Sequence, residues 1–142
     1  MLAYGVLQGF QQRFVVDRFF EELGRAWTDY KVLFFRNQVL SAEQHIDFAR
    51  RFGELEVHPF LRNNDERPEL VRFAKDADTG GYENGWHHDV TWREIPSKGA
   101  VLRAIQVPET GGDTLFCDMN AAYEGLSDEL KDRLEGLVAE HD

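Results

Sequence analysis

Apolar residues recur at helical spacing in the first third of the chain. Within residues 15–31 they share one helical face, with Asp17 as a candidate cap: Phe19, Phe20, Leu23, Ala26, Trp27 and Tyr30. A second helix is predicted to begin at Ser41, because Gln44 stands at the capping-box position of "SAEQHIDFARRFG". Gly53 is the expected stop of this helix.

The rest of the chain is dominated by short segments rich in β-branched and aromatic residues. Turn signals such as "TGG" and "PETGG" separate them, and the polar, glycine-rich stretch 74–85 is long enough to suggest a functional loop. The predicted strands are "KVLFFRNQ", "LEVHPF", "ELVRFA", "WHHDVTW", "AVLRAIQV" and "DTLFCDM". Ser127 is predicted to open a last helix, with Asp128 and Glu129 at its positive end. Helices followed by a run of strands indicate an α+β fold with an antiparallel sheet.

Composition narrows the class of protein and of partner. The 142 residues suit one domain, and 16 Lys and Arg against 26 Asp and Glu give a net charge of −10. Such a charge argues against nucleic acid and against an anionic membrane surface as the main partner, because both would repel the chain. Cys117 is the only cysteine and is expected to be buried and inert. With no signal peptide or membrane span in the sequence, the expected location is cytoplasmic.

The stretch "GYENGWHHDVTW" carries the chemistry. In a strand, residues two apart share a face, so His87 and Asp89 are expected to project together while His88 points away to pack or to form a hydrogen bond. An imidazole beside a carboxylate supplies two thirds of a 2-His-1-carboxylate iron site. The three-residue pattern is weak by itself: zinc could bind the same ligands, and a polar patch on a strand is the plain alternative. His45 is expected to be a solvated or packed helical residue.

Longer blocks around this stretch resemble the taurine dioxygenase family, Fe(II)- and 2-oxoglutarate-dependent oxygenases that include alkylsulfatases and dichlorophenoxyacetate dioxygenases. "WHHDVTW" is similar to the family's "WHxDVTF", "PETGGDTLF" to its "P-x-x-GGDTLW", and "AAYEGLS" with "AEHD" to its closing block, over about residues 15–142. The resemblance implies a double-stranded β-helix, a cupin-like jelly roll with flanking helices. Residues 1–142 would form the N-terminal part of a single dioxygenase domain, apparently truncated.

The resemblance also implies roles for particular residues. His87 and Asp89 would be the first two ligands of Fe(II), and the hydroxyl of Thr114 would bind the distal carboxylate of 2-oxoglutarate, with O₂ as the second cosubstrate. The implied reaction is hydroxylation of a small anionic substrate, such as a sulfonate or a sulfate ester, with release of succinate and CO₂. An aspartate at position 89 favours hydroxylation over halogenation, because halogenating relatives have a small residue there.

The substrate residues agree less well with the family's prototype. His58 matches the histidine that binds the sulfonate of taurine, but Leu61 replaces a tyrosine and Glu83 replaces an asparagine, so taurine itself is doubtful. Asn84 lies one place later and is the substitute donor. Two further residues, equally suited to the core, are expected to line the substrate pocket: Val90 and Trp92.

The family's distal iron-binding histidine and its cosubstrate-binding arginine lie beyond "AEHD", and the sequence ends at Asp142. His141 matches a family histidine that is not a ligand. A second hypothesis is therefore a non-catalytic remnant or binding module that retains half of the metal site and pairs with another chain or, as a homo-oligomer, with its own copy. A third is a zinc-dependent hydrolase. With uncovered strand edges, the isolated chain is expected to be poorly soluble or to self-associate.

Overall fold

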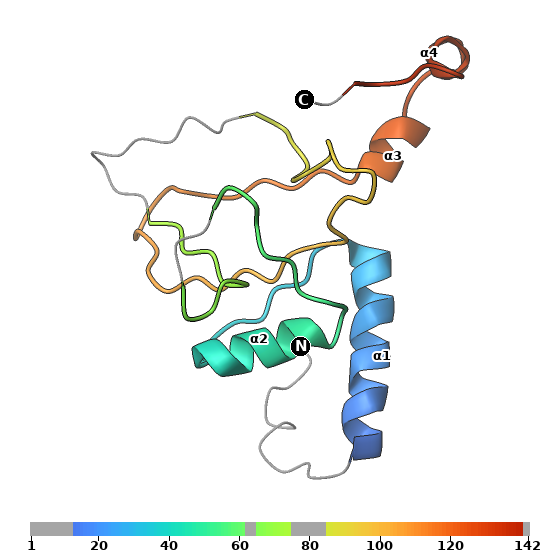
Figure 1. The fold of residues 1–142 in the computed structure, drawn as a ribbon. Coiled ribbons are helices and arrows are strands. Elements are labelled where there is room, and N and C mark those ends of the chain that lie inside the picture. Colours follow the sequence, from blue (N-terminus) through green and yellow to red (C-terminus); the bar gives the residue numbers. More distant parts are fainter. Residues whose placement is uncertain (1–12, 62–64, 75–84, 141–142) are drawn as a thin grey trace. The chain divides into compact units, whose positions relative to one another are not determined.

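The computed structural model describes residues 13–61, 65–74 and 85–140. Its helices are α1 (Arg13–Tyr30), α2 (Ala42–Arg50), α3 (Met119–Glu124) and α4 (Asp128–Leu134), joined by irregular segments (Figure 1). The chain divides into two compact units. The first contains the described residues up to Val39 together with Gly111–Leu126, and the second contains Leu40–Thr110 and the residues from Ser127 onward. Helices α1 and α3 belong to the first unit, and α2 and α4 belong to the second.

Helix α1 confirms the first predicted helix. It begins four residues before Asp17, which therefore lies inside the helix and is not its cap. Leu23, on the predicted apolar face, is 6% exposed. The helix ends where Lys31 adopts φ 65°, donates its backbone N–H to the Trp27 carbonyl (2.8 Å) and directs Nζ to the Thr28 carbonyl (2.5 Å). An ammonium group there satisfies a carbonyl at the negative end of the helix.

Helix α2 begins as the sequence predicts. The Ser41 hydroxyl accepts a hydrogen bond from the Gln44 backbone N–H (3.2 Å), and the Gln44 side chain accepts one from the Ser41 backbone N–H (2.8 Å). This reciprocal pair is a capping box. Ile46 is buried, and the helix is capped at its C-terminal end by Arg51. Gly53, the expected stop, follows two residues later.

The two short helices show one prediction confirmed and one helix missed. Ser127 caps α4 by accepting from the Leu130 backbone N–H (3.3 Å), as its position predicts. Helix α3 was not predicted, because the segment "DTLFCDM", which ends at the first residue of this helix, has the pattern of a strand. Asp118 starts α3 by accepting from the N–H groups of Asn120 (2.9 Å) and Ala121 (3.3 Å).

The individual strand predictions are wrong for the described residues, which contain no strand. A sequence pattern typical of strands shows only that its side chains would fit a pleated surface. The segment becomes a strand only if a neighbouring strand is present to form the hydrogen bonds of a sheet. Left-handed backbone also interrupts two of the segments, at Asn37 (φ 58°) and at Val90 (φ 52°). The jelly roll therefore remains a prediction.

Long-range side-chain contacts nonetheless join several of these segments. In the first unit the rings of Phe34 and Phe116 meet edge to face, with centroids 6.0 Å apart. In the second unit His45 Nε2 lies 2.8 Å from the Val101 carbonyl oxygen, a contact that joins α2 to a segment 56 residues further along the chain. His45 is thus a packed, hydrogen-bonded residue, as expected.

Few of the described side chains are buried. The buried apolar residues among them are Leu23, Ile46 and Val90. Cys117 is exposed, which corrects the expectation of a buried thiol: the segment that carries it forms no sheet and so has no covered face. Among the described residues, no helix has both the length and the apolar character needed to cross a bilayer.

Candidate metal centre

Seven residues are predicted to form the site. Five of them are described residues of the second unit: His58, His87, Asp89, Val90 and Trp92. Asn84 lies outside the described residues. Thr114 belongs to the first unit, where it is exposed and follows Gly111 (φ 78°) and Gly112 (φ 72°). Left-handed backbone favours glycine, and together with the bend at residues 109–110 these two glycines confirm the predicted "PETGG" turn.

The side chains of His87 and Asp89 face each other. Their Nε2 and Oδ1 atoms are 3.5 Å apart, and the side chains are 63% and 74% exposed. This is the pairing that the sequence predicts, although the backbone differs: residues 86–88 are irregular and a turn begins at Asp89. The pair therefore does not depend on a strand.

The protonation of His87 follows from its second ring nitrogen. Nδ1 lies 3.0 Å from the Gly85 carbonyl oxygen, and because a carbonyl only accepts, Nδ1 must carry the proton. In the neutral ring, Nε2 then presents a lone pair toward the Asp89 carboxylate. Two acceptors that face each other repel, although solvent screens this repulsion at such exposure, and a proton or a metal cation between them would turn it into attraction. A metal-binding histidine is typically oriented in this way, by a backbone carbonyl on its other nitrogen.

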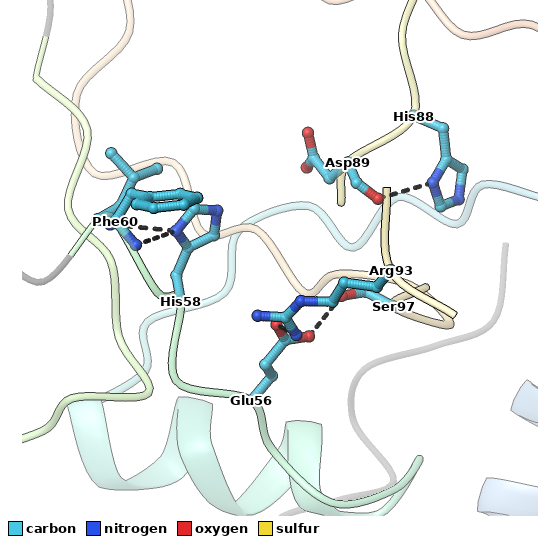
Figure 2. Close-up of polar contacts among 8 residues, drawn as sticks. Glu56, His58, Phe60, His88, Asp89, Arg93 and Ser97 are labelled. Carbon is cyan, nitrogen blue, oxygen red and sulfur yellow. Dashed lines mark hydrogen bonds and ion pairs between the residues drawn. The ribbon is translucent and has the colours of Figure 1, made fainter. Parts of the chain in front are cut away.

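His88 has a different environment. Its Nδ1 lies 3.0 Å from the backbone carbonyl oxygen of Asp89, and the ring turns away from the Asp89 carboxylate (Figure 2). The prediction that His88 points away and forms a hydrogen bond is confirmed.

The His87–Asp89 pair fits a first-row metal ion as two of its ligands. For bonds of about 2.1 Å, adjacent donor atoms are about 3.0 Å apart at a right angle and about 3.4 Å apart at a tetrahedral angle. The observed 3.5 Å is close to this range. Among the described residues, no group of three or more His, Cys, Asp or Glu side chains could enclose a metal ion. The described part of the chain could thus supply two donors, and a metal site would need at least one more.

A strained turn follows the pair. Val90 has φ 52°, an unfavourable conformation for a β-branched residue, and it is 8% exposed. Its carbonyl accepts from the Arg93 backbone N–H (3.1 Å). Of the two predicted roles, pocket lining or core, the burial of Val90 favours core.

His58 is held in the opposite tautomer to His87. Its Nδ1 accepts from the backbone N–H group of Phe60 (3.2 Å; Figure 2) and from that of Leu61 (3.1 Å). Backbone amides only donate, so Nδ1 has no proton and the neutral ring carries its N–H on Nε2. His58 therefore presents a hydrogen-bond donor, which is what an anionic ligand group requires.

Sequence reasoning did not single out Phe60. Its ring lies 6.3 Å from that of His58 and 6.0 Å from that of Trp92, measured between centroids, and Phe60 is 77% exposed. The guanidinium carbon of Arg93 lies over the Trp92 ring, 5.1 Å from its centroid. The pattern "VHPF" offered a weak signal, an aromatic residue two places after the candidate histidine.

Glu56, Arg93 and Ser97 were also missed. The Glu56 carboxylate accepts from Arg93 through Oε1 and from the Ser97 hydroxyl through Oε2, the latter at 2.6 Å (Figure 2). The contacts span 37 and 41 residues, so no local pattern in the sequence could have indicated them.

Outside this site, an ion pair joins the first turn of α2 to Arg67. The pKa of Glu43 is lowered by a hydrogen bond from its own backbone N–H, then by the Ser41 hydroxyl and by the Arg67 guanidinium. The hydrogen bond between the Arg67 guanidinium and the Glu43 carboxylate also raises the pKa of Arg67. The Glu43 carboxylate therefore stays ionised to lower pH than an isolated one.

Most of the chain is similar to known proteins. The model of the family described as "Taurine catabolism dioxygenase TauD, TfdA family" matches residues 8–142. An (S)-phenoxypropionate/alpha-ketoglutarate-dioxygenase of Sphingobium herbicidovorans is 42% identical over 126 residues, covering 84% of this chain and 43% of the relative. An alpha-ketoglutarate-dependent 2,4-dichlorophenoxyacetate dioxygenase of Cupriavidus pinatubonensis is 39% identical over 139 residues, 84% of this chain and 48% of the relative.

A more distant relative acts on another type of compound. An alpha-ketoglutarate-dependent sulfate ester dioxygenase of Pseudomonas putida is 34% identical over 122 residues, 85% of this chain and 40% of the relative. The chain thus spans less than half the length of these curated relatives. No solved structure matches it significantly.

Proposed function

The chain belongs to the taurine catabolism dioxygenase TauD, TfdA family, and from this premise we propose that it forms the N-terminal part of an Fe(II)- and 2-oxoglutarate-dependent dioxygenase. The match over residues 8–142 and the names of the relatives support this proposal. When bound, the iron with 2-oxoglutarate and O₂ would supply the oxidising chemistry that hydroxylates a substrate C–H bond and yields succinate and CO₂. The jelly-roll fold of the complete domain is part of the same proposal.

The observation that carries the proposal is the orientation of His87. Its Nδ1–H is engaged by the Gly85 carbonyl, so Nε2 directs a lone pair to the space beside the Asp89 carboxylate. These two groups would hold the metal ion. The carboxylate would also offset part of its charge. The remaining ligand would come from a part of the protein that the described residues do not include.

Thr114 would orient the cosubstrate. Its hydroxyl can donate to the distal carboxylate of 2-oxoglutarate without adding charge, and the glycine turn before it supplies the sharp change of direction. This role stays a prediction, as do those of Asn84 and of Trp92.

His58 and Phe60 support an anionic substrate with an apolar body. The Nε2–H of His58 would donate to the acidic head group, and the exposed ring of Phe60 beside it offers apolar contact area. Leu61 replaces the tyrosine of taurine-binding relatives, which removes a donor and adds apolar surface. We therefore extend the expected substrates from sulfonates and sulfate esters to phenoxyalkanoates.

The second candidate function is a binding module without catalytic activity. It is supported by the described residues themselves, which supply two metal donors and no cluster of three. In that case His87 and Asp89 would form an ion pair when the ring is protonated and would bind metal weakly.

An anaerobic titration distinguishes these functions. The full-length protein containing this chain is titrated with Fe(II) and then with 2-oxoglutarate, and the visible charge-transfer band of the chelated complex is recorded. The proposal predicts one iron per chain and a band. It also predicts that His87→Gln and Asp89→Asn each weaken iron binding at least about 100-fold, because loss of even an outer-shell partner costs about 10- to 100-fold.

His88→Gln is the matched control. It removes a neighbouring imidazole that is bonded to a backbone carbonyl, so iron binding and the band should persist. A wild-type protein that binds iron weakly and forms no band would favour the binding module. Tight zinc binding with hydrolytic activity in the absence of O₂ would instead identify a hydrolase.

A further inference from the structure

A polar cluster joins two segments of the second unit that each carry part of the candidate site. Glu56 uses both carboxylate oxygens, one for the Arg93 guanidinium and one for the Ser97 hydroxyl (Figure 2). The Arg93 and Glu56 side chains are 27% and 35% exposed. By contrast, the local pair Arg18–Glu22 in α1 is 72% and 50% exposed. Partial burial and a third partner distinguish the Glu56 cluster from an ordinary surface ion pair.

The residues of the cluster are close in sequence to residues of the candidate site. Glu56 lies two residues before His58, and Arg93 lies four residues after Asp89. Arg93 also closes the Val90 turn through its backbone N–H. Loss of the Glu56 contact would therefore free both the substrate-binding segment and the turn that follows the metal-binding pair.

A second contact joins the same two segments. Phe60, two residues after His58, meets the ring of Trp92, which in turn lies under the Arg93 guanidinium. The polar and the aromatic contacts are adjacent, and both connect residues 56–60 to residues 92–97. The two segments are thus held at two points, which limits their rotation about either one.

We propose that Glu56 is a positioning residue: by binding Arg93 and Ser97 it sets the His58 donor relative to the His87–Asp89 pair, and so determines how well the anionic substrate is held. The inference rests on the proposed function, since it assigns the substrate group to His58 and the metal to the pair. It concerns residues that the sequence analysis did not single out.

The coupling is tested first without metal or substrate, by amide hydrogen exchange in the full-length protein. Arg93→Gln should raise exchange at the amides of Phe60 and Leu61, which donate to His58, by about tenfold, the size expected for a lost charge-assisted hydrogen bond in a partly exposed site. Glu56→Gln should likewise raise exchange at the amide of Arg93. The double variant should do no more than either single one.

Arg50→Gln provides the matched control. Arg50 lies in the same unit and pairs with Glu69 at 3.1 Å, a contact that also joins distant parts of the sequence. Removing it should leave exchange at Phe60 and Leu61 unchanged. Unchanged exchange in Arg93→Gln, or the same rise in Arg50→Gln, would overturn the inference.

The positioning role is tested next by kinetics. Glu56→Gln should raise KM for the anionic substrate about tenfold, while kcat and Fe(II) affinity stay near the wild-type values. An altered exchange with unchanged KM would make the cluster merely structural and refute the role. If the proposed function is wrong, the wild-type protein itself will form no iron complex. That outcome is distinct from any difference between the wild-type protein and the variants.

Discussion

Helix α2 and the turn region of residues 85–93 lie in the same unit, yet they relate to the sequence in opposite ways. The start of α2 is determined by residues three apart, Ser41 and Gln44, which satisfy each other's backbone groups. The turn region has the composition of a strand and forms none. It contains a local bond, from the Arg93 backbone N–H to the Val90 carbonyl, and the Arg93 side chain also pairs with Glu56, 37 positions away. Local rules suffice for the start of the helix, whereas the turn region also has a contact that no local rule predicts.

The largest expected difference between the two regions is seen in their histidines. His87→Ala should weaken Fe(II) binding at least about 100-fold with little effect on the free energy of unfolding, since the side chain is 63% exposed. His45→Ala should do the reverse: it leaves the Val101 carbonyl without its partner and should lower the free energy of unfolding by about 1–2 kcal/mol. Isothermal titration and urea unfolding of both variants provide the measurements. If His87→Ala and His45→Ala weakened Fe(II) binding equally, His87 would have no special role in binding the metal.

The next effect concerns the cap of α2. Ser41→Ala removes the acceptor for the Gln44 N–H and should lower the free energy of unfolding by about 1 kcal/mol, whereas Ser41→Gly should cost only a few tenths. Urea unfolding followed by circular dichroism measures both. If alanine were tolerated as well as glycine, the capping box would not be what starts the helix.

In the turn, the usual order of alanine and glycine should reverse. At an ordinary position alanine is more stable than glycine by about 0.5–1 kcal/mol, but left-handed backbone costs a residue with a Cβ about 1–2 kcal/mol. At Val90, with φ 52°, the glycine variant should therefore be more stable than the alanine variant by about 1 kcal/mol. Both variants lose the buried side chain, so their difference isolates the backbone. A more stable alanine variant would mean that the turn is not left-handed at this residue.

The smallest effect is the pH dependence at the start of α2. Because the pKa of Glu43 is lower in the folded protein, its stabilisation is fully present above the unfolded value, 4.5, and is lost as the pH falls through the folded value. The difference in urea midpoint between the wild-type protein and Glu43→Gln should be visible at pH 7 and should disappear in more acidic solution. A difference that grew on acidification would contradict the assignment.

The sequence predicted those features that neighbouring residues determine. Ser41 and Ser127 were identified as caps, and Gly111 with Gly112 as a turn, because hydroxyl acceptors and missing Cβ atoms act within a few residues. The facing of His87 and Asp89 was also predicted, although from a strand geometry that the chain does not adopt. The family resemblance, rather than the three-residue pattern, made that prediction specific.

The missed features depend on the three-dimensional arrangement. Helix α3 lies in a segment that reads as a strand, and its start rests on the side-chain conformation of Asp118. Glu56 could not be linked to Arg93 from spacing, since nothing in either neighbourhood indicates the other. The exposure of Cys117 escaped prediction because an apolar run indicates burial only when another surface covers it.

The tautomer of His58 has a consequence for metal selectivity. With Nδ1 occupied by two backbone amides and Nε2 carrying the proton, the neutral ring offers no lone pair to a cation. His58 cannot complete the coordination shell begun by His87 and Asp89 unless two backbone hydrogen bonds break. In the proposed function, the two rings would therefore have separate tasks: His58 would donate to an anion and His87 would bind a cation, because each ring carries its proton on a different nitrogen.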